Sequence, residues 1–130
     1  MKPTVILSVE DNPDNMMLLS RIFSRENYRL MEARNGIQGL SIAESQDIDL
    51  ILLDINLPDI DGYEVARRLR SSRKSELADI PIIAITANAL KADGRKCIDA
   101  GCNRYMSKPI DIQELWDTVE ALVPSKFDRD

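Results

Sequence analysis

Four consecutive aliphatic residues, 50–53, lead directly into the carboxylate of Asp54, and a segment rich in Pro, Asp and Gly follows up to Gly62. A short apolar run that is closed by turn-forming residues is typical of a buried central strand of a parallel sheet. Ligands of open α/β sheets bind outside the carboxyl ends of the strands. This strand would therefore deliver one acid to the place where such folds carry out chemistry.

Strand-like and helix-like segments alternate along the chain. Short β-rich or apolar runs predict four further strands, at residues 4–9, 28–33, 81–86 and 104–107. Helical spacing of apolar residues predicts five helices, which begin near residues 13, 36, 62, 89 and 112. Alternation with short connections predicts an α/β fold, a doubly wound five-stranded parallel sheet with helices on both faces. We expect one domain over residues 1–124 and a short tail over 125–130.

The individual helices carry more detailed expectations. The first should run to about Glu26, with Asn12 or Asp11 as its cap. The basic end of the third helix, residues 67–74, could dock an acidic partner, but a solvated helix end is the simpler reading. The fourth, residues 89–100, should be poorly anchored, since it has few apolar positions and an interior glycine, Gly94. The inward-facing residues of the second and fifth helices should be Ile37, Leu40, Ala43, Ile112, Leu115, Val119 and Leu122.

Composition excludes several classes of protein. A net charge of −5 disfavours binding to a phosphate backbone, and the absence of His removes Ser-His-Asp and Cys-His catalysis. Cys97 and Cys102 lack the further ligands that a zinc site needs, so we expect two small, semi-buried thiols in a reducing cytoplasm. The chain shows no signal peptide and no apolar run of about 18 residues, which predicts a cytoplasmic protein.

Polar residues follow the predicted strands at their carboxyl ends: Glu10, Asp11, Asp54, Thr86 and Lys108. Clustered carboxylates repel one another and need a compensating cation, and hard oxygen ligands suit Mg²⁺. The chemistry that uses Mg²⁺, a lysine and a hydroxyl around a nucleophilic carboxylate is phosphoryl transfer. Taken singly, the acidic pair could be a helix start favoured by the dipole, the threonine a turn cap and the lysine a surface residue. Their joint placement favours phosphoryl transfer to Asp54.

With these residues the chain resembles the receiver domain of two-component response regulators. The resemblance covers about residues 4–122 and rests on Glu10-Asp11, on Asp54 in the run that ends at Gly62, on Thr86-Ala87 and on Lys108-Pro109. It implies the flavodoxin-like strand order 2-1-3-4-5 and a cis Lys108–Pro109 bond. It also implies that Asp54 accepts a phosphoryl group from a histidine kinase or a histidine phosphotransfer protein.

The same resemblance implies a role for each site residue. Mg²⁺ would be held by Asp11, Asp54 and the backbone carbonyl of Asn56, with Glu10 acting largely through water. Thr86, Ala87 and Lys108 would bind the phosphoryl group. Thr86 would then move toward it and Tyr105 would turn inward, which switches the surface of the predicted fourth helix, fifth strand and fifth helix. Asn56 and Asn88 occupy positions that tune the phosphoryl lifetime in the family, and Ser8 replaces the usual aliphatic residue.

We therefore expect a stand-alone signalling protein that is not an enzyme in the ordinary sense and that acts on a downstream protein, without nucleic-acid or membrane partners. A dehalogenase-like phosphatase would need a second Asp two residues after the nucleophile, where this chain has Asn56. A constitutive docking protein would gain nothing from clustered carboxylates. A flavin or nucleotide carrier would need a Gly-rich phosphate loop, which the sequence lacks.

Overall fold

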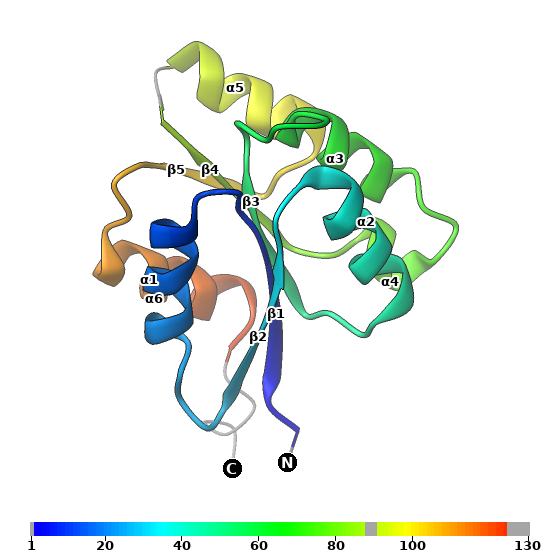
Figure 1. The fold of residues 1–130 in the computed structure, drawn as a ribbon. Coiled ribbons are helices and arrows are strands. Elements are labelled where there is room, and N and C mark those ends of the chain that lie inside the picture. Colours follow the sequence, from blue (N-terminus) through cyan, green and yellow to red (C-terminus); the bar gives the residue numbers. More distant parts are fainter. Residues whose placement is uncertain (1, 88–90, 125–130) are drawn as a thin grey trace.

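The protein is described from a computed structural model that covers residues 2–87 and 91–124 (Figure 1). Within these residues, five parallel strands form one sheet in the order β2-β1-β3-β4-β5, which confirms the predicted strand order. The strands are β1 (Thr4–Val9), β2 (Tyr28–Ala33), β3 (Leu50–Asp54), β4 (Ile82–Thr86) and β5 (Arg104–Ser107). All five residues of β3 are buried, as expected for the central strand.

Six helices connect and follow the strands in the described part of the chain, one more than predicted. They are α1 (Pro13–Ile22), α2 (Gly36–Ser45), α3 (Gly62–Arg70), α4 (Ser75–Ala78), α5 (Lys91–Ala100) and α6 (Ile112–Leu122). The additional helix, α4, is a single turn of four residues and is too short to show helical periodicity. The longest helix, α6, has 11 residues, and no described helix is long and apolar enough to cross a membrane.

The helices cover both faces of the sheet (Figure 1). One face carries α1 and α6, and the other carries α2, α3, the short α4 and α5. Each face has its own core, because alternate residues of every strand point to opposite sides. The first core includes Leu19, Leu52, Ile83, Leu115 and Val119, and the second includes Leu7, Leu53, Val65, Leu69 and Cys97.

Several predictions at helix ends were wrong. Helix α1 ends at Ile22 rather than near Glu26, because the backbone leaves helical geometry at Phe23. Ile37 and Ile112 were expected to face inward but are 52% and 48% exposed. Both stand in the first turn of their helices, beyond the stretch that lies over the sheet. The start of the predicted fourth helix, residues 88–90, and the predicted tail, residues 125–130, lie outside the described residues.

Candidate functional site

Three of the predicted site residues meet at the edge of the sheet where the strands have their carboxyl ends. Glu10 follows β1, Asp54 is the last residue of β3, and Lys108 follows β5. The Lys108 ammonium lies 3.2 Å from Oε1 of Glu10 and 3.2 Å from Oδ2 of Asp54. Both carboxylates are only 2% exposed, whereas the lysine side chain is 22% exposed. One partly accessible cation therefore serves two buried acids.

Backbone amides hold the other oxygens of these two acids. The N–H of Asn12 donates to Oε2 of Glu10, and the N–H of Asn56 donates to Oδ1 of Asp54, both at 3.1 Å. Asn12 also caps α1, since its Oδ1 accepts from the amides of Asp14 and Asn15. Of the two predicted caps, the structure thus selects Asn12 and leaves Asp11 available to the site.

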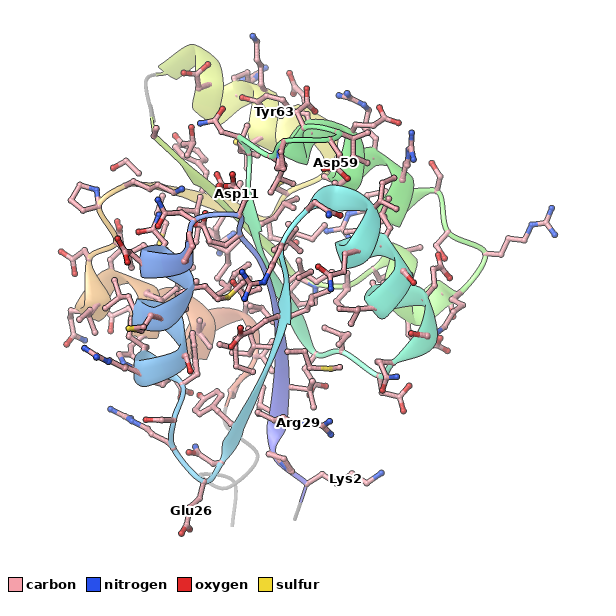
Figure 2. The ribbon with its side chains drawn as sticks, in the orientation of Figure 1. Lys2, Asp11, Glu26, Arg29, Asp59 and Tyr63 are labelled. Carbon is pink, nitrogen blue, oxygen red and sulfur yellow. The ribbon has the colours of Figure 1, made fainter. Side chains whose placement is uncertain are left out.

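Asp11 completes an acidic cluster. Glu10, Asp11 and Asp54 each offer a carboxylate oxygen, and these oxygens lie within 4.8 Å of one another. Figure 2 shows Asp11 at the upper end of the sheet, opposite the end that carries Lys2 and Arg29. Asp11 is exposed, so the cluster is open to solvent on one side.

Burial and charge oppose each other at this site. Burial raises the pKa of Glu10, and the neighbouring Asp54 raises it further, against the lowering effects of the Asn12 amide and of Lys108. Burial lowers the pKa of Lys108, but Asp54 and Glu10 outweigh it, so that this pKa is raised above its usual value. The lysine is therefore charged throughout the physiological pH range, and ionising all three acids leaves two negative charges uncompensated.

The chemistry of this donor set fits a hard divalent cation. Three carboxylate oxygens lie within 4.8 Å of one another, and such oxygen ligands are the ones that Mg²⁺ prefers. Although the Lys108 ammonium is 3.2 Å away, Oε1 of Glu10 has no hydrogen-bond partner among the described residues. A divalent ion, or water bound to it, would supply both the missing charge and the missing partner.

The second group of predicted residues lines the same edge of the sheet from β4. Thr86 is the last residue of β4 and is buried, and its carbonyl accepts a 2.8 Å hydrogen bond from the N–H of Lys108. This bond fixes the lysine to the neighbouring strand. Ala87 follows as an exposed residue, whereas Asn88 lies outside the described residues. The Lys108–Pro109 bond is cis, as the resemblance implied.

Tyr105 stands one strand away from Thr86, on the same face of the sheet. It pairs in register with Ala84, whose side chain shares a face with that of Thr86 because strand residues two apart point the same way. The Tyr105 side chain is 41% exposed and lies against α5 at Gly94. The structure thus brings Thr86 and Tyr105 to one side of the sheet, and Tyr105 is in an outward position.

Arg70 was predicted to belong to a solvated helix end, and this prediction was wrong. Its guanidinium donates to the carbonyls of Gly101 (2.9 Å) and Ala78 (3.0 Å) and to Oδ1 of Asn103 (2.9 Å). These bonds tie α3 to the ends of α4 and α5. The fourth predicted helix is therefore firmly held at its C-terminal end, in contrast to the expectation of weak anchoring throughout.

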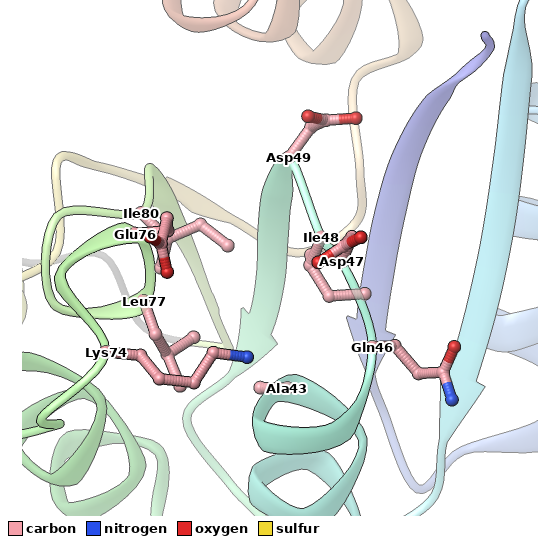
Figure 3. A pocket seen from close by; sticks show the side chains of 9 residues that line it. All are labelled: Ala43, Gln46, Asp47, Ile48, Asp49, Lys74, Glu76, Leu77 and Ile80. Atoms are coloured by element: carbon pink, nitrogen blue, oxygen red, sulfur yellow. The ribbon is translucent and has the colours of Figure 1, made fainter.

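A separate cavity of about 230 Å³ lies at the opposite end of the sheet (Figure 3). It is enclosed by the end of α2, the start of β3 and the short α4, and its charged residues include Asp47, Asp49, Lys74 and Glu76. The Nζ of Lys74 donates to the carbonyl of Glu44, and Oδ2 of Asp49 accepts from the N–H of Val5. These groups lie at the end of the sheet opposite the acidic cluster and take no part in it.

Comparison with known proteins places the chain among signalling domains. Residues 6–120 match the family described as "Response regulator receiver domain". The polar-differentiation response regulator DivK of Brucella anthropi is 38% identical over 119 residues, which cover 92% of this chain and 95% of the relative. DivK of Brucella ovis is 37% identical over 116 residues, or 89% of this chain and 93% of the relative.

Solved structures agree with this fold. The receiver domain of a sensor histidine kinase from Pseudomonas aeruginosa, which has a magnesium ion coordinated in its active-site cleft, is 38% identical with a TM-score of 0.85. The match covers 95% of this chain and 99% of that domain. A CheY-like receiver domain from Methanospirillum hungatei is 25% identical with a TM-score of 0.83, covering 92% and 93% of the two chains.

Proposed function

Because the chain belongs to the response regulator receiver domains, we propose that it signals through Mg²⁺-dependent phosphorylation of Asp54. The observation that carries this proposal is the position of Lys108, whose single ammonium is 3.2 Å from each of two buried carboxylates. A structural ion pair needs only one carboxylate. The second buried acid is costly without a further cation, and together with the exposed Asp11 it has a use if a metal and a phosphoryl group share the site.

In the proposed reaction an oxygen of Asp54 attacks the phosphorus of a phosphohistidine. The new P–O bond forms an acyl phosphate while the P–N bond breaks and the imidazole nitrogen leaves with its electron pair. The Asn56 amide orients the attacking carboxylate through its 3.1 Å hydrogen bond to Oδ1. Lys108 is placed to neutralise the charge on the transferred group, and Thr86 and Ala87 lie at the adjoining strand end to contact it.

The metal site of this proposal consists of Asp11, Asp54 and the backbone carbonyl of Asn56, with Glu10 acting largely through water. These residues would hold Mg²⁺, which would supply positive charge against the negative charge of the carboxylates and of the transferred group. The donor set and the burial of Glu10 and Asp54 around a single ammonium support this assignment. The magnesium-containing relative from Pseudomonas aeruginosa supports it independently.

The phosphoryl donor in this proposal is a histidine kinase or a histidine phosphotransfer protein, and the protein acts in the cytoplasm as a stand-alone receiver over residues 1–124. The match to DivK covers 95% of the length of that relative, which is named a response regulator. A net charge of −5 supports a protein target rather than a nucleic acid. The protein would catalyse only its own phosphorylation and a slow loss of the phosphoryl group.

The proposed output surface consists of α5, β5 and α6. It carries three exposed apolar side chains, Ile98 (44%), Tyr105 (41%) and Ile112 (48%), which suit a protein target. A phosphoryl group on Asp54 would draw in the Thr86 hydroxyl and make room for Tyr105, which shifts a pre-existing equilibrium of this surface.

Intact-mass measurement tests the phosphorylation. Wild type incubated with acetyl phosphate should gain one phosphoryl group only when Mg²⁺ is present, and the adduct should be stable to acid and labile to base. Asp54→Asn should gain none, whereas Asp47→Asn, which removes an acid at the far end of the sheet, should behave as wild type. No adduct on wild type after rapid quenching would overturn the proposal and leave a docking protein.

Hydrogen exchange tests the output surface. Beryllofluoride with Mg²⁺ should change amide exchange in α5 and β5 of wild type and leave Asp54→Asn unaffected. In Thr86→Ala the change at β5 should be reduced, because the hydroxyl that couples the two positions is missing. An undiminished change in Thr86→Ala would show that this coupling is wrong.

A further inference from the structure

We propose that Asp59 is a positioning residue, which holds the Asn56 segment in place by capping a helix that lies more than 20 residues earlier in the chain. This inference rests on the proposed function, because Asn56 matters to the extent that it serves the phosphoryl and metal site. Figure 2 shows Asp59 beside the first turn of α2.

Both carboxylate oxygens of Asp59 bind the start of α2, and we call this two-bond contact the clamp. Oδ1 of Asp59 accepts from the N–H of Gly36 and Oδ2 accepts from the N–H of Ile37, both at 2.8 Å. These are two of the amides that a helix start leaves unpaired, and the positive end of the helix dipole favours a carboxylate there. The two backbone hydrogen bonds lower the pKa of Asp59 although desolvation opposes them. Asp59 is therefore ionised at neutral pH.

The helix start is shaped for this contact. A Cβ at position 36 would lie 2.6 Å from Cγ1 of Ile60 and 3.2 Å from its carbonyl oxygen, so that only glycine lets the segment come this close. Helix α2 itself packs on the end of β1, where Gly39 lies against Val9. Val9 directly precedes the acidic pair Glu10-Asp11. The clamp therefore joins the segment that follows Asp54 to the strand end that carries the other two acids.

Asp59 acts on the middle of the segment between Asp54 and Gly62, which is held less firmly than the two ends of that segment. The ends of the segment are held by backbone bonds, from Ile55 N–H to the Ile85 carbonyl (3.0 Å) and from Gly62 N–H to the Ile55 carbonyl (2.9 Å). Asn56, which contributes its amide to Asp54 and its carbonyl to the proposed metal site, lies between these ends. Without the clamp, the segment that presents Asn56 would lose the two side-chain hydrogen bonds that join it to the start of α2.

A matched control exists on the same helix end. Asn35 also caps α2, through a 2.8 Å bond from the N–H of Gln38 to its Oδ1, but it does not reach the Asn56 segment. Asn35→Ala and Asp59→Ala should therefore destabilise α2 by similar amounts, and only Asp59→Ala should release the segment. Asp59→Asn keeps one acceptor and should give an intermediate result.

The experiment combines two readouts on these variants. Hydrogen exchange without metal should be faster at residues 56–60 in Asp59→Ala than in Asn35→Ala. Calorimetric titration with Mg²⁺ should give a Kd about tenfold weaker for Asp59→Ala, the lower end of what outer-shell partners of a metal site contribute, and a Kd within about twofold of wild type for Asn35→Ala. Repeating the titration near 1 M salt, where the Debye length is about 3 Å, removes the simple effect of deleting a charge.

Each result decides the inference. A difference in Kd between the two variants that persists in high salt supports it. Equal Kd values, or a difference that high salt abolishes, would overturn it while leaving phosphorylation of Asp54 intact. Failure of wild type to bind Mg²⁺ at all would instead overturn the proposed function and the inference together, and the exchange data would then describe a purely structural clamp.

Discussion

Replacing Gly94 by Ala tests whether the absence of a side chain at this position makes room for the Tyr105 ring in its outward position. Gly94 lies inside α5, where glycine costs about 1 kcal/mol relative to alanine. It is buried, and a Cβ at this position would lie 2.6 Å from Cε2 and 2.7 Å from Oη of Tyr105. These distances are too short for any side chain, so that the ring must move when alanine is present.

The structure sets the size of the effect. In the wild-type background the helix gain of about 1 kcal/mol is opposed by overpacking of about 1–3 kcal/mol, so Gly94→Ala should be neutral or destabilising by up to about 2 kcal/mol. In a Tyr105→Ala background the clash is absent, and the same substitution should stabilise by about 1 kcal/mol. The coupling energy between the two sites should therefore be about 1–3 kcal/mol, which is the overpacking cost itself.

The assay is a double-mutant cycle from urea unfolding of wild type, the two single variants and the double variant, all without metal. Stabilisation by about 1 kcal/mol in both backgrounds corresponds to a coupling energy below about 0.3 kcal/mol. That result would show that Gly94 is not needed to make room for the Tyr105 ring. If the coupling is present, the ring resonances of Tyr105 in Gly94→Ala should also shift toward those that beryllofluoride induces in wild type.

Three further predictions concern the acidic site, and a fourth concerns the buried Ser8 of β1. Asp54→Asn should raise the unfolding free energy without metal by about 1 kcal/mol, or about 4 °C in Tm, because fewer acids then share Lys108. Mg²⁺ at ten times its Kd should add roughly 1.4 kcal/mol to wild type only, and equal responses would remove Asp54 from the metal site. The raised pKa of Glu10 means that the native state holds its proton more tightly than the unfolded state, so metal-free wild type should lose stability relative to Glu10→Gln as the pH rises from 4.5 toward 7. Parallel urea-derived stabilities of these two proteins over that range would contradict this. Ser8 is 1% exposed and its hydroxyl has no hydrogen-bond partner among the described residues, so Ser8→Ala should stabilise by about 1 kcal/mol, and a loss of stability in urea would show that the hydroxyl is satisfied.

The site could be predicted because its residues are tied to strand ends. The aliphatic run before Asp54 indicates both the strand and the point at which it stops, and parallel strands bring all such points to one edge of the sheet. The same reasoning correctly predicted that Glu10 and Lys108 would meet Asp54. It needed no knowledge of distant contacts, since the topology alone places these three residues together.

The contacts that tune the site were not predictable in this way. Asp59 caps a helix more than 20 residues earlier, and Arg70 binds the ends of two other helices, so neither role leaves a local pattern in the sequence. Gly94 was interpreted as a weakness of its helix because its benefit depends on a ring from another strand. Ile37 and Ile112 were misplaced because periodicity continues to the end of a helix even where the sheet beneath it does not.

The two ends of α5 differ in a way that bears on signalling. At its C-terminal end the amides of Gly101 and Cys102 bond to the carbonyls of Ile98 and Cys97, each at 3.0 Å, and Arg70 binds the Gly101 carbonyl. The first two bonds lie within the end of α5 itself, whereas a shift of this end against α3 would break the Arg70 bond to the Gly101 carbonyl. Toward the other end, the contact at Gly94 is with the partly exposed ring of Tyr105, which can leave without breaking the sheet. If Thr86 moves on phosphorylation as proposed, we expect α5 to pivot about its C-terminal end, with the Tyr105 ring as the part that moves.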